Sequence, residues 1–217
     1  MSGERDTAVR RARPFELHAA VGCPQPAELA FSLAWELGEF DVDRTERTLW
    51  TLAANLTSMS GAKAHLRALG RLVSAGTLQA RQGGGPECLL IDRVLERGTG
   101  HPLVVAILLC ELARRAGVPA GIVGNERGHF VAHQRLTEAL VLDPMSGALV
   151  DAGDLGVLRW HCGHQIAAEL LDAIEQRYER SGDLTNALRV ARMRCALPFE
   201  ETSVAEAGLR RLTARLN

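Results

Sequence analysis

Aromatic residues are scarce in this sequence: they make up only 4% of its 217 residues, whereas hydrophobic residues as a whole make up 47%. The core must therefore rest on leucine, valine and alanine side chains. Because aromatic and β-branched residues are the ones enriched in strands, this aliphatic bias favours a helix-rich fold over an all-β sandwich. A chain of this length is expected to form one large or two small domains and to bury a sizeable core.

The sequence also lacks an excess of either charge, with a formal net charge of -1 at pH 7. Without a basic excess, no charge is available to displace counterions from a nucleic-acid backbone, so nucleic-acid binding is not expected. No apolar run approaches the roughly 20 residues of a membrane-spanning helix. The longest extends from Leu103 to Cys110 and stops at Glu111. The charged N-terminal segment has no signal-peptide pattern, so we expect a cytoplasmic protein that does not enter a membrane.

Cysteine is sparse, and its spacing gives no sign of pairing. The number of cysteines is odd, they lie far apart, and no CxxC motif occurs. This pattern favours reduced thiols in a cytoplasm, and a disulfide framework is not expected. The five cysteines are Cys23, Cys88, Cys110, Cys162 and Cys195.

Residues 1–82 predict a helical N-terminal subdomain. Leu29, Leu33 and Leu37 recur at a spacing of four, which marks one apolar face of a helix. Two further apolar stripes in the same region, each followed by a glycine, predict two more helices. The segment at 83–86, three glycines and a proline, then marks a boundary. It lacks the Lys and the Ser or Thr of a phosphate-binding loop, so it predicts a flexible turn.

Residues 83–160 change from helical to strand periodicity and predict the core of the protein. The segment from Pro102 to Ala116 is apolar nearly all round, which predicts a helix buried in the centre of the domain. Three short runs of β-type residues follow it. A buried helix followed by an antiparallel meander is an α+β arrangement. The three runs lie at 120–123, 129–133 and 139–142.

Residues 161–217 are helical again. Ile166, Leu170 and Ile174 mark the apolar face of one helix. The order of residues from Tyr178 to Pro198 resembles a single tetratricopeptide unit. Because a tetratricopeptide solenoid needs three or more units, we predict a helical hairpin that packs on the core.

Polar residues at the ends of the predicted core elements suggest the layout of a thiol enzyme. His129 opens one strand, Asp143 follows the next, and His101 and Pro102 open the buried helix. In a thiol enzyme, a helix dipole favours the thiolate of a cysteine at the helix N-terminus. A histidine on a neighbouring strand takes the proton, and an aspartate orients the imidazole. The sequence thus carries a candidate histidine and aspartate, but no cysteine at the helix start.

This ordering resembles the transglutaminase-like superfamily, and in particular its SirB-type branch. The resemblance lies in four motifs and extends from about Glu28 to Leu212. That branch combines a helical N-terminal part, a papain-like core and tetratricopeptide-like C-terminal helices. The motifs are LLIDRVLER at 89–97 with GHP at 100–102, ELARRAGVP at 111–119, GHF at 128–130 and LDP at 142–144.

The resemblance implies a helix-rich α+β fold, in which a buried helix packs on a small antiparallel sheet between N- and C-terminal helices. It also implies that His129 and Asp143 stand where active relatives carry their triad histidine and aspartate. The superfamily nucleophile maps near Pro102, where the SirB-type branch also generally lacks cysteine. Cys110 lies eight residues further along the helix, about 12 Å at 1.5 Å per residue. Cys88 precedes a different helix and would approach only through movement of the glycine loop.

Two functions follow as hypotheses. In the first, the protein is a non-catalytic, SirB-type binding or regulatory module for a protein or peptide partner, without a cofactor. His129 and Asp143 are then triad remnants, and His101 and Pro102 form the wall of a cleft. In the second, it is a cysteine-dependent hydrolase or acyl-transfer enzyme that uses a displaced cysteine with His129 and Asp143. The sequence identifies neither the partner nor the oligomeric state.

A metal-supported protein is a third hypothesis, because His161, Cys162 and His164 offer three donors within four residues. Structural zinc sites usually take a pair of ligands from each of two places, and no second pair of this kind is present. We therefore expect no metal, and we expect these residues to cap a helix or to line an interface.

Overall fold

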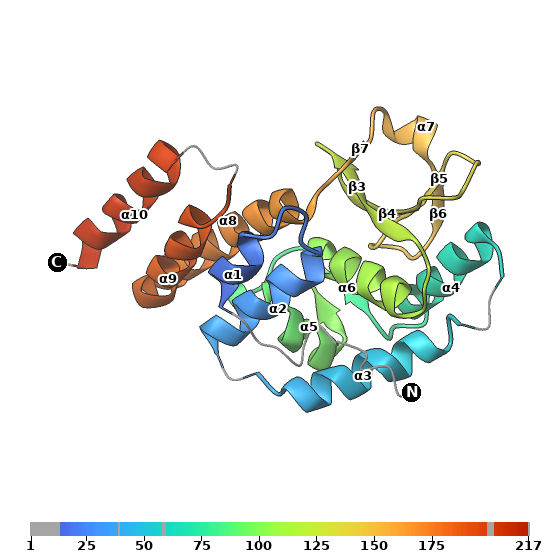
Figure 1. The fold of residues 1–217 in the computed structure, drawn as a ribbon, viewed down its shortest axis with the longest axis horizontal. Coiled ribbons are helices and arrows are strands. Elements are labelled where there is room, and N and C mark those ends of the chain that lie inside the picture. Colours follow the sequence, from blue (N-terminus) through green and yellow to red (C-terminus); the bar gives the residue numbers. More distant parts are fainter. Residues whose placement is uncertain (1–13, 39, 58–59, 199–201, 217) are drawn as a thin grey trace.

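The computed structural model describes residues 14–38, 40–57, 60–198 and 202–216 (Figure 1). Most of the helices lie on one side of a small sheet, and the N-terminal part is helical, as its apolar stripes predict (Figure 1). Gln25 caps the second helix through a capping box, and Pro26 occupies its first turn, where a missing N–H costs nothing. The N-terminal helices are α1 (Phe15–Ala19), α2 (Pro26–Leu37), α3 (Val42–Ala54) and α4 (Ala62–Ser74).

The central helix, α6 (Pro102–Arg115), is buried along nearly its whole length, as its uniform apolarity predicts. Before it lie the short helices η2 (Pro86–Leu89) and α5 (Ile91–Arg97), and a two-residue parallel pair of strands. That pair consists of β1 (Gln79–Ala80) and β2 (Thr99–Gly100).

Charged residues enter the core as a paired network at the end of α6. Both carboxylate oxygens of Glu111 accept hydrogen bonds from Arg114, and one of them also accepts from Arg115. The Arg115 guanidinium also donates two hydrogen bonds to Glu46 of α3, at 2.6 and 3.0 Å, and lies 5.2 Å from the ring centre of Trp50. Because buried charges are tolerated only when they are paired, this network fixes α3 against α6.

The predicted meander is present as an antiparallel sheet, in the order β6-β5-β4-β3-β7. The α+β fold expected from the sequence is therefore confirmed. A two-residue strand, β7, adds to the edge beside β3, and the short helix α7 (Ala152–Leu155) precedes it. The strands are β3 (Ala120–Asn125), β4 (Gly128–His133), β5 (Leu140–Leu142), β6 (Leu149–Asp151) and β7 (Arg159–Trp160).

The two faces of the sheet bury different clusters. Val131 pairs with Leu142, and both belong to the main core that contains α6. Their strand neighbours Phe130 and Val141 belong to a second, smaller cluster. Since successive side chains of a strand point to opposite faces, this alternation assigns a face to each polar residue near the strand ends.

Helix α4 lies against the sheet at the turn between β5 and β6, where two glycines meet. A side-chain carbon on Gly70 would collide with the carbonyl oxygen of Gly147, and one on Gly147 would collide with the carbonyl oxygen of Gly70. Gly147 also has a φ of 73°, a left-handed conformation that favours glycine. The absence of both side chains is what allows helix and turn to approach this closely.

The C-terminal helices are α8 (Gly163–Ser181), α9 (Leu184–Cys195) and α10 (Thr202–Leu216). Helix α8 packs on α2 and η2 and buries Ile166, Leu170 and Ile174, the face that its periodicity predicts. Asp183 caps α9 by accepting a hydrogen bond from the backbone N–H of Asn186. Among the described residues, no helix combines the length and apolarity needed to cross a membrane.

Candidate functional site

The start of α6 carries an imidazole where a thiol enzyme would carry its cysteine. His101 is the N-cap residue, and its Nδ1 accepts a hydrogen bond of 3.3 Å from the backbone N–H of Leu103. Burial lowers the pKa of His101 to about 4, and the charges of Arg177 and His129 act in the same direction. The imidazole is therefore neutral at pH 7, as an N-cap acceptor must be.

The two thiols considered as displaced nucleophiles lie in different surroundings. Cys110 packs on the main core, where burial raises the pKa of its thiol to about 12, with a further contribution from the charge of Glu111. It is protonated at neutral pH and is not a nucleophile. Cys88 lies in η2, its carbonyl oxygen accepts a hydrogen bond from His101 N, and its sulfur lies against Gly84.

Asp143 is engaged in its own turn. Its carboxylate accepts hydrogen bonds from Met145 N at 2.9 Å, Ser146 N at 3.2 Å and Ser146 Oγ at 2.6 Å. Asp143 lies just beyond β5, which ends at Leu142, so the turn holds its side chain. His129, two residues before Val131, is on the α6 face. In the described part of the chain, no hydrogen bond joins Asp143 to His129, contrary to the expected triad geometry.

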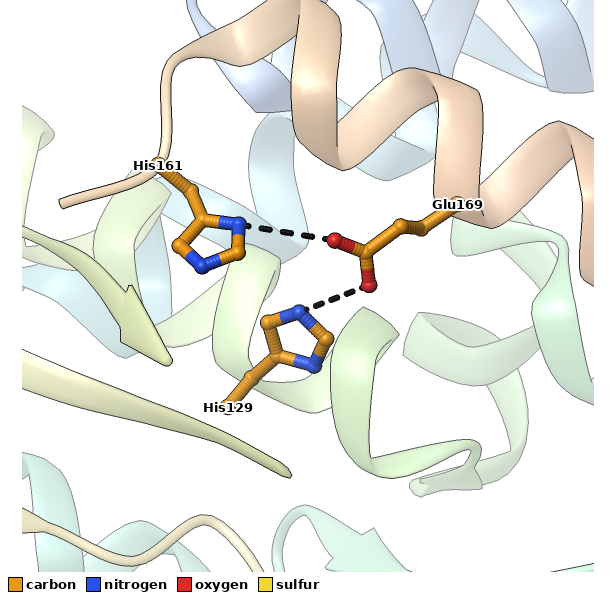
Figure 2. Close-up of side chains that lie close together, drawn as sticks. All are labelled: His129, His161 and Glu169. Atoms are coloured by element: carbon orange, nitrogen blue, oxygen red, sulfur yellow. Dashed lines mark ion pairs between the residues drawn. The ribbon is translucent and has the colours of Figure 1, made fainter. Parts of the chain in front are cut away.

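The carboxylate beside His129 belongs instead to Glu169 of α8 (Figure 2). His129 Nε2 lies 2.9 Å from Glu169 Oε2, and His161 Nδ1 lies 3.4 Å from Glu169 Oε1. The two imidazoles meet edge to face, with ring centres 5.3 Å apart. The structure thus brings together three residues from β4, from the segment after β7 and from α8. We call His129, His161 and Glu169 the His–Glu cluster.

Backbone pairing and a glycine place the two imidazoles next to each other. His129 pairs with Gly124 of β3, and His161 N donates a hydrogen bond of 3.0 Å to Ile122 O of the same strand. A side-chain carbon on Gly124 would lie 3.2 Å from His129 Cδ2 and 3.2 Å from His161 Nε2. Gly124 therefore leaves the space that both rings occupy.

The electrostatics of the His–Glu cluster favour an ionised carboxylate. The hydrogen bond from His129 is the largest effect that lowers the pKa of Glu169, the charges of both imidazoles add to it, and partial burial opposes it. Glu169 is 44% exposed, whereas the two imidazoles are 16% and 18% exposed. The His–Glu cluster is thus open to solvent mainly on its carboxylate side.

Comparison with known protein families identifies residues 46–179 as a match to the transglutaminase-like superfamily. The chain belongs to this superfamily. The matched region begins in α3, ends in α8, and includes His101, His129, Asp143 and the rest of the His–Glu cluster. No curated protein and no solved structure matches the chain.

In this superfamily member, the three donors at 161–164 do not act together. Cys162 is the N-cap residue of α8, and its backbone N–H donates a hydrogen bond of 3.0 Å to Gln165 Oε1. His164 is buried, with Nε2 2.8 Å from Ala19 O, so it joins α8 to α1. Only His161 reaches the His–Glu cluster. The expected helix-capping role fits Cys162.

A cleft of about 540 Å³ lies beside the His–Glu cluster. It borders the β3–β4 hairpin and the segment before β7, where Val157 is 78% exposed. Arg127 and Arg159 line the cleft, so it combines apolar and positively charged surface. The cleft is lined by Gly124, Asn125, Glu126, Arg127, Leu155, Val157, Arg159 and His161.

Proposed function

We propose that this superfamily member is a non-catalytic, SirB-type protein that binds a protein or peptide partner. The observation that carries the proposal is the start of α6, where His101 and Pro102 stand near the position of the superfamily nucleophile. Thiol catalysis needs a thiolate in contact with its base and close to an oxyanion site. A neutral imidazole that caps the helix supplies neither the nucleophile nor room for one.

The surroundings of Cys110, His129 and Asp143 also favour a non-catalytic role. Cys110 is protonated and lies about 12 Å along α6 from the helix start at 1.5 Å per residue. The Nε2 atom of His129 is already in contact with Glu169, and Asp143 is bonded within its own turn. A displaced-cysteine enzyme would have to rearrange both contacts.

A binding role needs a surface, and we propose the cleft beside the His–Glu cluster. Arginine is one of the residue types enriched in binding hot spots. Leu155 and Val157 would accept an apolar side chain, and Arg127 and Arg159 an acidic one. The proposed partner is therefore an acidic peptide segment with an apolar anchor.

The cytoplasmic location and the tetratricopeptide-like nature of the C-terminal hairpin remain part of this proposal. The cysteines are all free thiols, as is usual in a reducing cytoplasm. Helices α8 and α9 pack against each other as an antiparallel pair, which is compatible with one such unit.

The binding proposal is tested with peptides selected from a random library on the full-length chain. We expect Arg159→Ala to weaken the selected peptides by roughly 30-fold or more, since truncating a hot spot costs about 2 kcal/mol or more. Arg159→Glu should weaken acidic peptides in particular. The matched control is Arg47→Ala, which removes an exposed arginine on α3, outside the cleft. Equal losses for Arg47→Ala and Arg159→Ala would place the binding surface elsewhere.

The absence of catalysis is tested separately. We expect no turnover of peptide and glutamine substrates and uniformly slow alkylation of the cysteines by iodoacetamide at pH 7. The decisive variants are Cys88→Ala, Cys110→Ala and His129→Ala. Turnover that requires one cysteine together with His129 would establish the displaced-cysteine enzyme and overturn the proposal.

A further inference from the structure

The His–Glu cluster has the composition of a metal site, independently of any peptide partner. One nitrogen of His129, one nitrogen of His161 and one carboxylate oxygen of Glu169 all lie within 4.8 Å of one another. Two imidazoles and a carboxylate form the ligand set of many zinc sites that keep one position open for water. The sequence gives no sign of this set, because its members come from β4, from the segment after β7 and from α8.

Hydrogen bonding alone leaves one of these atoms unsatisfied. His161 Nδ1 is buried and has no hydrogen-bond partner of normal geometry, although Glu169 Oε1 lies 3.4 Å away. Buried polar nitrogens are nearly always paired, so an orphan of this kind calls for an explanation. An ion between the imidazoles and the carboxylate would give this nitrogen a partner (Figure 2).

The dimensions and exposure of the His–Glu cluster also suit an ion. Ligand atoms about 2.1 Å from a tetrahedral metal lie about 3.4 Å apart. The carboxylate contacts of 2.9 and 3.4 Å are already near this value. The Glu169 side chain is 44% exposed, so an ion can reach its carboxylate from solvent, and the absence of a side chain at Gly124 leaves room for both imidazoles. The exposed carboxylate side leaves a coordination position for water.

We infer that His129, His161 and Glu169 bind one divalent first-row transition-metal ion, with Zn²⁺ as the best-fitting probe. Imidazole nitrogen suits Zn²⁺, whereas Mg²⁺ demands oxygen ligands. Two neutral imidazoles and one carboxylate carry a charge of about -1, which a divalent cation more than neutralises. The site joins the sheet to α8, so the ion also cross-links two layers of the fold.

The experiment uses the full-length chain without an affinity tag, because a histidine tag would itself bind Zn²⁺. Zn²⁺ titration by calorimetry should show one site per chain, and Zn²⁺ should raise the melting temperature because it binds the folded state. Mg²⁺ should do neither. Glu169→Gln keeps the size and an acceptor oxygen but removes the charge. It should weaken Zn²⁺ by roughly 100-fold or more, since even outer-shell partners are worth 10–100-fold.

Two further variants and two controls decide the location. His129→Ala and His161→Ala should also abolish tight binding, and circular dichroism verifies that each is folded. His65→Ala removes the imidazole that stacks on His133, at the other end of β4. Cys162→Ser removes the thiol next to His161. Both variants should retain the site. A chain without saturable Zn²⁺ binding would overturn the inference. So would binding that survives Glu169→Gln, or binding that is lost equally in His65→Ala or Cys162→Ser.

Discussion

Strand β4 presents a histidine pair at each of its ends, and the two pairs differ in one partner. At its start, His129 meets His161 edge to face, and Glu169 lies between the two rings. At its end, His133 stacks on His65 of α4, with ring centres 5.6 Å apart and planes inclined by 13°. His65 Nδ1 and His133 Nε2 lie 3.4 Å apart. Both pairs consist of two imidazoles, and Glu169 adds a carboxylate to the first.

The second pair disfavours positive charge on His133. Burial lowers the pKa of His133, and the charges of His65 and Arg135 add to the effect. His133 Nδ1 accepts a hydrogen bond from Arg135 N, so the proton of the neutral ring is on Nε2, which faces His65. At the first pair, the carboxylate of Glu169 lies against both imidazoles. The comparison teaches that two pairs on one strand owe their chemistry to the helix that covers each.

The largest effect should come from a substitution at Gly124, which lies beside both imidazoles of the first pair. Gly124→Val would push a side chain against both imidazoles and against Gly128 O, 2.9 Å from the new Cβ. We expect a loss of about 2–3 kcal/mol of unfolding free energy, as for overpacked sites. Urea denaturation measures it. Gly121→Val is the matched control on the same strand, because its new side chain meets only the half-exposed Trp160 ring. Equal losses for both valines would refute this account of Gly124.

A smaller effect concerns the third imidazole near the first pair, His101. Its pKa in the folded state, about 4, is below the value of 6.5 expected in the unfolded chain. The unfolded state therefore binds more protons as the pH falls from 6.5 to 4, and stability is lost over that window. Allowing for solvent screening of this half-buried group, we expect the free energy of unfolding to fall by about 1–2 kcal/mol over this window.

Urea denaturation at pH 7 and at pH 4.5 measures this contribution of His101. His101→Asn keeps an acceptor that can cap α6 but cannot titrate, so its stability should fall less between the two pH values. The histidines common to both proteins, His133 included, cancel in the difference. Equal losses of unfolding free energy in the two proteins would show that His101 does not cause the loss of stability at low pH.

The smallest change should sharpen the comparison by converting the second pair into a copy of the first. His65→Glu puts a carboxylate beside His133, which favours the protonated imidazole. We expect the pKa of His133 to rise by about 1 unit, measured by NMR titration of its ring protons. His65→Asn removes only the neighbouring charge and should raise it less. A His133 pKa that stays low beside the new carboxylate would mean that burial alone governs it.

Much of the fold follows from hydrophobic periodicity. The uniformly apolar stretch after Pro102 predicts the buried α6, and the change of period after it predicts the meander. Strand β7 could not be predicted, because Arg159 and Trp160 are too few to show alternation and form a strand only through pairing with β3. Tertiary pairing decides such short elements.

The site was harder to predict than the fold. His129 stands out beside its strand, but Glu169 is one carboxylate on a helix whose charged residues mostly face water. Nothing in its spacing from His129 or His161 signals contact, because packing of α8 over the sheet edge creates it. The resemblance pairs Asp143 with His129, whereas in the structure the turn after β5 holds the Asp143 carboxylate. The signal is in the sequence, because an aspartate before a proline is a common turn residue whose side chain bonds its own backbone.

The contact between Gly70 and Gly147 has a consequence for mutational tolerance. Each glycine lies against the backbone of the other, so a side chain at either position cannot be accommodated by a rotamer change nearby. Only withdrawal of α4 as a whole, or a different path for the turn, makes room. The two positions therefore both require glycine for the same reason, and α4 constrains the path of the turn that carries Asp143.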